Sequence, residues 1–418
     1  MRYRLDTGSP AGTPDCENGH RYIKTEAILL SMNLGNRTAS AAVLVLLVML
    51  IVPAGGEPVR STDYAPWPTD AWTRVPAESQ QVNSTILQSM LDHFKSNQIA
   101  VDSILIVRNG YLILEEYLSH YRPNDLHHQF SVTKSVLSAL IGIAVQEGFI
   151  DSISTPMLSF FPNRVVANVD DNKRAMTIGH LLRMDAGFEW NEEHYGTALN
   201  DYNRMIRSKD WIQYVLDRRI AARPGEIFQY NSGLSHLLSA ILQNSTGMKT
   251  VDFAKRYLFD PLGIDEYVWD TDPAGINEGG SKLKLRPLDM AKIGYLFLRE
   301  GDWDGKQIIP RKWIHSVSTT QLIVDKYRGY SLHWWTLPQL DVYYALGWGS
   351  QSIVVMPDYG VVIAVSAATL HKSAEVTTIL NKWILPSMGQ SVSQQETIAS
   401  FQPVFVVIAG APFALILV

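Results

Sequence analysis

The chain has 418 residues, of which 46% are hydrophobic and 18% are charged, and its formal net charge at pH 7 is −5. This composition excludes a disordered or collagen-like chain, and the length allows one large two-lobed domain or roughly two to three smaller ones. The basic residues form no Lys/Arg block, so we expect no general affinity for nucleic acid. The single cysteine, Cys16, excludes an intramolecular disulfide framework and a zinc site built on cysteines.

Residues 1–56 are expected to form a leader and signal peptide. Residues 41–52 are a charge-free apolar run between a basic residue and a group of small residues, which is the pattern of a secretory signal. The run is shorter than the about 20 apolar residues of a spanning helix, and an uncleaved N-terminal anchor is the alternative. A start at Met32 would give a signal of conventional length, and cleavage would remove Cys16. We therefore expect an exported protein, periplasmic or extracellular.

Residues 57–79 are rich in proline and predict an extended linker, and residues 80–390 are expected to form the folded domain. The β-prone runs 103–107 and 111–117 meet at Asn109-Gly110, which is typical of a hairpin. Helical spacing of apolar residues then predicts helices in three segments, which are 132–146, 234–243 and 288–299. Further strands are expected at 340–346, 352–356 and 360–367. Strands at both ends of a helical middle predict an α+β fold with an antiparallel sheet built from distant segments.

Ser131 and Lys134 form a Ser-x-x-Lys pattern at the start of the first helix. A serine at that position displays its hydroxyl at the positive end of the helix dipole, where backbone N–H groups can hold an anion. A lysine three residues later lies on the same face, and a desolvated amine there can take the serine proton. The pattern is common, because Ser281 and Lys284 match it too. On the pattern alone, Ser131 is as well explained as an ordinary helix cap.

Tyr230 and Ser232 lie two positions apart, directly before the second helix, and could project to one side of an extended turn. A phenol near a lysine ammonium can transfer the proton of a nucleophile. The alternative is a tyrosine beside a capping serine.

The segment Gly347, Trp348, Gly349 and Ser350 is expected at the start of a strand. Glycine permits close backbone approach, so a substrate carbonyl could lie against this strand. A strand N–H could then join that of Ser131 in an oxyanion hole. The alternative is a tight turn with an exposed indole.

Together and in this order, the three motifs resemble the serine β-lactamase and penicillin-binding-protein superfamily. The branch is that of class C β-lactamases, their esterase relatives and the 6-aminohexanoate-dimer hydrolases. The resemblance spans about residues 80 to 390 and includes the segments HLLRMDAGFEW at 180–190 and RPGEIFQYNSG at 223–233. It implies an antiparallel sheet flanked by helices plus a mainly helical lobe, with a groove between them.

The resemblance also implies roles for the motif residues. Ser131 would be the acylated nucleophile, Lys134 its proton-transfer partner, and Tyr230 the general base and acid. The Gly-Trp-Gly residues would take the position of a Lys-Thr-Gly motif, and the backbone N–H groups of Ser131 and Ser350 would be the oxyanion donors. No metal or other cofactor is implied.

Two departures from class C β-lactamases affect the expected substrate. Those enzymes have Asn at the position of Ser232 and Lys at the position of Gly347. Without that lysine, a β-lactam carboxylate lacks a cationic partner. We therefore expect a hydrolase of small esters, amides or peptides rather than an efficient β-lactamase. The alternatives are a penicillin-recognising sensor that acylates without turnover and a D-Ala-D-Ala peptidase.

His120, His127 and His128 precede the nucleophile without a metal-ligand pattern and are expected to be structural. Asp185 and Glu189 could line the mouth of the groove, although such carboxylates are more often solvated.

Asn83 and Asn244 begin glycosylation sequons, and residues 391–418 are expected to form a linker and a hydrophobic tail. The tail from Phe401 carries no charge, which favours membrane association or packing on the domain.

Overall fold

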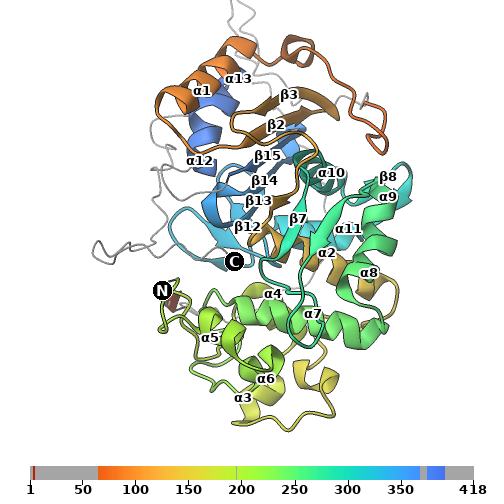
Figure 1. Ribbon diagram of the computed structural model, residues 1–418, viewed down its shortest axis with the longest axis vertical. Helices are drawn as coiled ribbons and strands as arrows, with labels where there is room; N and C mark the ends of the chain where they lie inside the picture. Colours follow the sequence, from red (N-terminus) through yellow and green to blue (C-terminus); the bar gives the residue numbers. More distant parts are fainter. Residues whose placement is uncertain (1–2, 5–64, 194, 368–373, 391–418) are drawn as a thin grey trace, which may run out of the picture. The chain divides into compact units, whose positions relative to one another are not determined.

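The computed structural model describes residues 3–4, 65–193, 195–367 and 374–390 (Figure 1). The expected signal peptide with Cys16 and the C-terminal tail lie outside the described residues. Within the described ranges, every helix is too short or too polar to span a membrane.

An eight-stranded antiparallel sheet forms the centre of the fold, in the order β10-β11-β12-β13-β14-β15-β2-β3. The strands are β2 (Ser103–Arg108), β3 (Tyr111–Tyr117), β10 (Leu322–Ile323), β11 (Gly329–Tyr330), β12 (Trp335–Leu337), β13 (Val342–Leu346), β14 (Ser352–Met356) and β15 (Val361–Ser366). The expected hairpin joins β2 to β3, and Asn109 and Gly110 both have the positive φ that such a tight turn requires. Pairing of β15 with β2 joins strands from the two ends of the domain, which confirms the expected α+β fold.

The sheet is buried on both faces. Successive residues of β2, such as Leu105 and Ile106, enter two different apolar clusters on opposite faces of the sheet. Helices α1 (Ser84–Ser96), α12 (Val376–Ile379) and α13 (Leu385–Ser387) cover one face. Helix α10 (Pro287–Leu298) covers the other face. Gly294 lets this helix approach β15 closely, since a Cβ at that position would be 2.4 Å from Val362.

The described part of the expected linker packs on this sheet. Thr73 and Val75 exchange backbone hydrogen bonds with Leu112 of β3, and Trp72 is buried against Tyr295 of α10. Residues 65–79 end in the helical turn that begins at Ala77, and they belong to the folded unit because they supply apolar side chains to its core.

A mainly helical lobe follows, shown in yellow and green in Figure 1. Its helices are α2 (Val132–Gln146), α3 (Asp171–Ala175), α4 (Ile178–Arg183), α5 (Asp201–Arg207), α6 (Trp211–Leu216), α7 (Ser232–Thr246), α8 (Thr250–Ala254) and α9 (Asp260–Leu262). Helix α11 (Arg311–Ser318) comes later in the chain, and short helical turns occupy 77–80, 157–160, 255–259, 348–350, 357–359 and 380–384. Small sheets pair β4 (His127–His128) and β6 (Tyr267–Trp269) with β7 (Leu283–Leu285), β8 (Asp302–Trp303) with β9 (Lys306–Gln307), and β1 (Tyr3–Arg4) with β5 (Ile227–Phe228).

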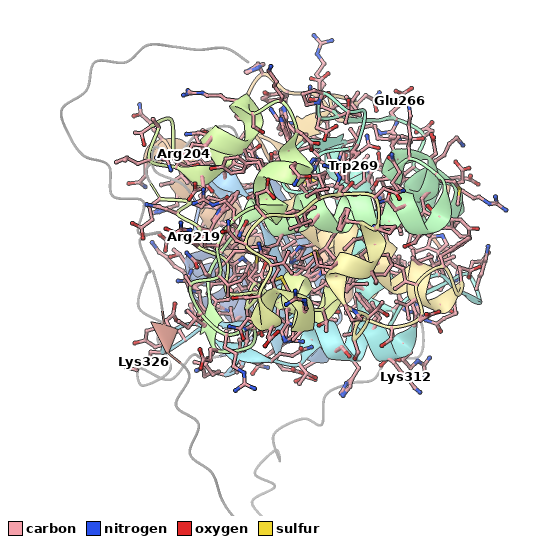
Figure 2. All side chains as sticks on the ribbon, turned by 90° about the horizontal axis from the view of Figure 1, so that it is seen from below. Arg204, Arg219, Glu266, Trp269, Lys312 and Lys326 are labelled. Carbon is pink, nitrogen blue, oxygen red and sulfur yellow. The ribbon has the colours of Figure 1, made fainter. Side chains whose placement is uncertain are left out.

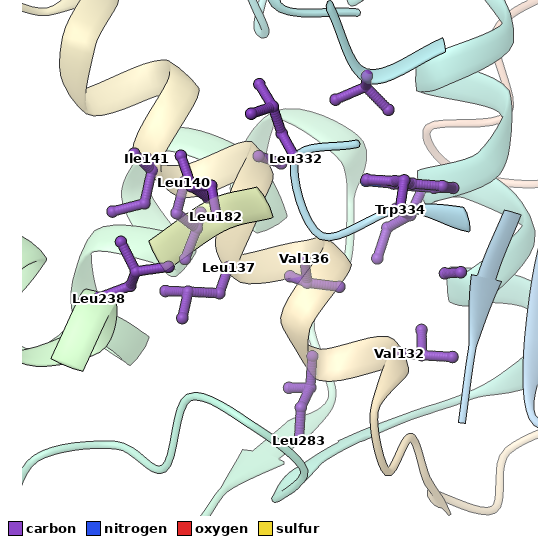
Figure 3. Packing of buried hydrophobic residues seen from close by; sticks show 14 of the residues in the cluster. Val132, Val136, Leu137, Leu140, Ile141, Leu182, Leu238, Leu283, Leu332 and Trp334 are labelled. Atoms are coloured by element: carbon purple, nitrogen blue, oxygen red, sulfur yellow. The ribbon is translucent and has the colours of Figure 1, made fainter. Parts of the chain in front are cut away.

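Helix α2 is the centre of the second core. All residues from Val132 to Ala144 are buried, so the helix is enclosed on every side although it contains Lys134 and three hydroxyl side chains. Figure 3 shows its leucines and valines beside Leu182 of α4, Leu238 of α7 and Leu283 of β7. By contrast, the labelled charged side chains of Figure 2, Glu266, Lys312 and Lys326 among them, are exposed at the periphery.

The turn between β11 and β12 connects three helices through His333. Its backbone N–H and its Nδ1–H both donate to the Leu182 carbonyl of α4 at 2.9 Å. Because that carbonyl can only accept, Nε2 is the acceptor for the Ser235 hydroxyl of α7 at 3.0 Å. The Ser135 hydroxyl of α2 donates to the His333 carbonyl at 2.7 Å. Burial lowers the pKa of His333 to about 3, with a further contribution from the nearby charge of Lys134.

We expect His333 to make stability depend on pH. The unfolded imidazole has a pKa near 6.5, so the unfolded chain takes up this proton first as pH falls. The contribution is complete above pH 6.5 and is lost progressively toward pH 3. Urea unfolding of wild type and H333Q at pH 7.5, 6 and 5 measures it. The variant should lose less unfolding free energy on acidification than wild type does, and equal pH slopes would contradict the assignment.

Candidate active site

Ser131 and Lys134 lie in contact at the start of α2. The Lys134 Nζ donates to the Ser131 Oγ at 3.1 Å and to the Gly280 carbonyl at 2.7 Å. Lys134 is only 2% exposed, whereas Ser131 is half-buried. The helical spacing therefore brings these two candidate residues together, with the amine shielded from solvent.

The residue before the nucleophile candidate has a strained backbone. Phe130 has a φ of 44°, which is uncommon for a residue with a side chain. Its ring packs between His128, with centroids 5.2 Å apart, and Trp348, with centroids 5.1 Å apart. The Gln129 N–H donates to the Leu283 carbonyl at 2.8 Å. These contacts hold the sharp turn that carries the chain from β4 to Ser131, and strain of this kind often occurs at functional sites.

Tyr230 lies beside the same lysine. The Lys134 Nζ is 4.9 Å from the centroid of the Tyr230 ring. The ring also stacks on Trp335 of β12, with centroids 6.4 Å apart and an interplanar angle of 18°. Three candidate residues from separate parts of the sequence, Ser131, Lys134 and Tyr230, are thus brought together.

Ser232 contacts a carboxylate that the sequence did not single out. Its backbone N–H and its hydroxyl donate to Glu192 at 2.6 and 2.5 Å. Glu192 also accepts from the Trp190 indole at 2.8 Å and from the Tyr195 hydroxyl at 2.7 Å. It therefore ties the start of α7 to the 190–195 segment. No motif distinguishes Glu192 from its neighbours in the sequence.

Asp185 and Glu189, the two carboxylates that could line the groove mouth, differ from each other in exposure. Asp185 is buried and forms an ion pair with Arg183 at 2.9 Å. Burial raises the pKa of Asp185, and the contact with Arg183 opposes this only partly. Glu189 is exposed.

The Gly347–Ser350 segment is a turn between β13 and β14, so the alternative of a tight turn is confirmed and the expected position at the start of a strand is wrong. Gly349 and Ser350 have φ values of 75° and 77°, which a strand cannot accommodate. At Gly347 the close neighbour is the protein's own backbone, because an added Cβ would lie 2.6 Å from the Gln129 carbonyl oxygen. Trp348 is half-buried against Phe130, so the turn packs on the residues that lead into Ser131.

Glu278 is a second carboxylate that the sequence did not indicate. It is completely buried and accepts from the Gly280 N–H at 2.9 Å, the Ser281 N–H at 2.5 Å and the Ser281 hydroxyl at 3.0 Å. Ser281 therefore caps a turn, unlike Ser131, although both match Ser-x-x-Lys.

The three histidines lie beside the nucleophile segment. His127 is buried with its Nδ1 4.0 Å from Asp102, His128 stacks on Phe130, and His120 stacks on Tyr121. Burial is the main cause that lowers the pKa of His127 and His128. Among the described residues, no group of three or more His, Cys, Asp or Glu side chains could hold a metal ion.

Comparison with known proteins gives a consistent result. The beta-lactamase family model matches residues 86–382. The chain is 25% identical over 232 residues to the 6-aminohexanoate-dimer hydrolase of Paenarthrobacter ureafaciens, covering 53% of this chain and 57% of that protein. The alignment thus spans little more than half of this relative.

Two solved structures share the fold. The octameric penicillin-binding protein homologue from Pyrococcus abyssi has a TM-score of 0.60 and 18% identity, covering 74% of this chain and 78% of that one. EstCE1, a hydrolase with promiscuous acyltransferase activity, has a TM-score of 0.62 and 14% identity, covering 75% of this chain and 99% of that one.

We expect G347A to disturb the nucleophile segment. The new methyl group would lie 2.6 Å from the Gln129 carbonyl oxygen, so the backbone leading to Ser131 must move. Overpacking of this kind costs about 1–3 kcal/mol. Urea unfolding at pH 7.5 measures the change in the free energy of unfolding. An unchanged value would show that the turn has more room than these contacts allow.

Proposed function

The chain belongs to the beta-lactamase family, and from this premise we propose that it is a serine hydrolase that cleaves esters or amides through an acyl-enzyme on Ser131. The observation that carries the proposal is the contact of the shielded Lys134 amine with the Ser131 hydroxyl at 3.1 Å. Tyr230, whose ring centroid is 4.9 Å from the same amine, is close to both residues, and its hydroxyl is the second proton-transfer group in this proposal.

The reaction has two steps. Lys134 and Tyr230 accept the Ser131 proton while Oγ attacks the substrate carbonyl, and Tyr230 returns a proton to the leaving alcohol or amine. The backbone N–H groups of Ser131 and Ser350 stabilise the oxyanion in this scheme. Water then attacks the acyl-enzyme with Tyr230 or Lys134 as base. The acid product leaves, and the proton returns to Ser131.

The surroundings of the site favour esters and amides over β-lactams. At Gly347 the backbone contact with Gln129 leaves no room for a lysine side chain. The Glu192 carboxylate is bound to Ser232, where it repels a substrate carboxylate. One relative in sequence, named as a 6-aminohexanoate-dimer hydrolase, supports the amide part of this preference.

A hydrolysis panel tests the proposed function. The substrates are short-acyl p-nitrophenyl esters, the 6-aminohexanoate dimer and a chromogenic cephalosporin. We expect turnover of an ester or the amide dimer, little turnover of the cephalosporin, and a loss of about 10³-fold or more in kcat for S131A. S89A, an exposed serine on α1, is the matched control and should retain wild-type activity. Full activity in S131A would refute the mechanism.

The same panel separates the alternative functions. A persistent adduct with the cephalosporin and no turnover of any substrate would instead indicate a penicillin-recognising sensor. Release of D-Ala from a D-Ala-D-Ala peptide, with transfer to an added amine, would indicate a peptidase.

A further inference from the structure

We propose that Glu278 is the buried counter-charge of Lys134 and a positioning residue of the active site. The structural half of this inference rests on contacts alone. The catalytic half rests on the proposed function, because it requires Lys134 to accept the Ser131 proton.

The Glu278 carboxylate has only neutral hydrogen-bond donors. Its three donors are two backbone N–H groups, of Gly280 and Ser281, and one hydroxyl. Within the described ranges it forms no ion pair at 4.0 Å or less with a lysine, arginine or histidine, although the side chain is 0% exposed. A buried charge is costly unless another charge compensates it nearby.

The compensating charge lies on the other side of Gly280. The Gly280 carbonyl accepts from the Lys134 Nζ at 2.7 Å, while the Gly280 N–H donates to Glu278. A Cβ built on Gly280 would be 2.8 Å from the Glu278 Oε1 and 3.3 Å from the Lys134 Nζ. The two charged atoms are therefore no further apart than these two lengths together. Gly280 also has no room for a side chain between them.

The other ionisable groups around Lys134 differ from Glu278 either in their charge or in their position relative to the amine. His333 lies in the turn before β12 and is neutral, because its pKa is about 3. Tyr230, before α7, presents its ring to the amine. Glu192 lies beyond Ser232, and Tyr202 of α5 lies beyond Ser281, to which it is hydrogen-bonded at 2.9 Å. Glu278 is the carboxylate joined to Lys134 through a single residue.

This arrangement gives Glu278 two effects. By binding the N–H groups of Gly280 and Ser281, it fixes the Gly280 carbonyl toward the lysine. By its charge, it stabilises the ammonium that forms when Lys134 takes the Ser131 proton. Removing this charge should therefore extend activity to lower pH, because an amine must be neutral to accept the Ser131 proton.

The first test is the pH profile of kcat/KM for wild type and E278Q. Glutamine keeps the size and an acceptor oxygen but removes the charge. We expect the acidic limb to move about one pH unit lower in E278Q, and kcat at the optimum to fall about fivefold with KM within twofold. A merely structural role would lower activity equally at every pH, and an unshifted limb would overturn the catalytic half of the inference.

The controls separate this inference from the proposed function. E266Q removes an exposed carboxylate on the molecular surface and should leave the limb in place (Figure 2). S131A is measured in parallel. Activity that persists in S131A refutes the proposed function, whereas Ser131-dependent activity with an unshifted E278Q limb refutes only the role of Glu278.

The second test uses stability and requires no activity. In K134M the Glu278 carboxylate is buried without its counter-charge, so adding E278Q should raise Tm by about 3 °C. In the wild-type background E278Q should lower Tm or prevent folding, because it leaves the ammonium uncompensated. If E278Q lowers Tm by the same amount in both backgrounds, the two groups are not coupled and the inference is wrong.

Discussion

Burial of the Lys134 amine is the constraint on which the rest of the site depends. A lysine that is 2% exposed must satisfy its donors within the protein, and it does so on Ser131 and Gly280. Helix α2, which carries it, is buried on every side. The contact of the lysine with the half-buried Ser131 lies where α2 begins. His333 is neutral because its own burial lowers its pKa to about 3, with a further contribution from the charge of Lys134.

The fold supplies this site from both of its parts. The helical lobe contributes α2 and the start of α7. The sheet contributes the turn before β12 and the turn after β13. His333 binds α2, α4 and α7 at once, and Gly347 lets its turn approach the backbone of Gln129. Phe130 is strained between these contacts. The position of Ser131 is thus fixed by packing on both sides rather than by its own helix alone.

What the sequence predicts well is local. The Asn109-Gly110 hairpin, helix α2 and the contact of Ser131 with Lys134 follow from turn chemistry and helical spacing, and the order of motifs indicated the family. At Gly347–Ser350 the sequence left a strand start and a tight turn open, because glycines suit a strand edge and a turn equally, and the structure has the turn. Glu192, Glu278 and His333 were not identified either. Each acts through partners 40 or more residues away or through burial, neither of which leaves a local pattern.

The central claim, an acyl-enzyme on Ser131, is tested most directly by mass spectrometry of the acid-quenched enzyme. The enzyme is mixed with an activated short-acyl ester, quenched within milliseconds to seconds, digested and sequenced by tandem fragmentation. The account predicts a mass increase equal to one acyl group on the peptide that contains Ser131, at Ser131 itself, and none in S131A. An acyl group on Ser232 or Ser281 instead, or turnover with no adduct at any quench time, would contradict it.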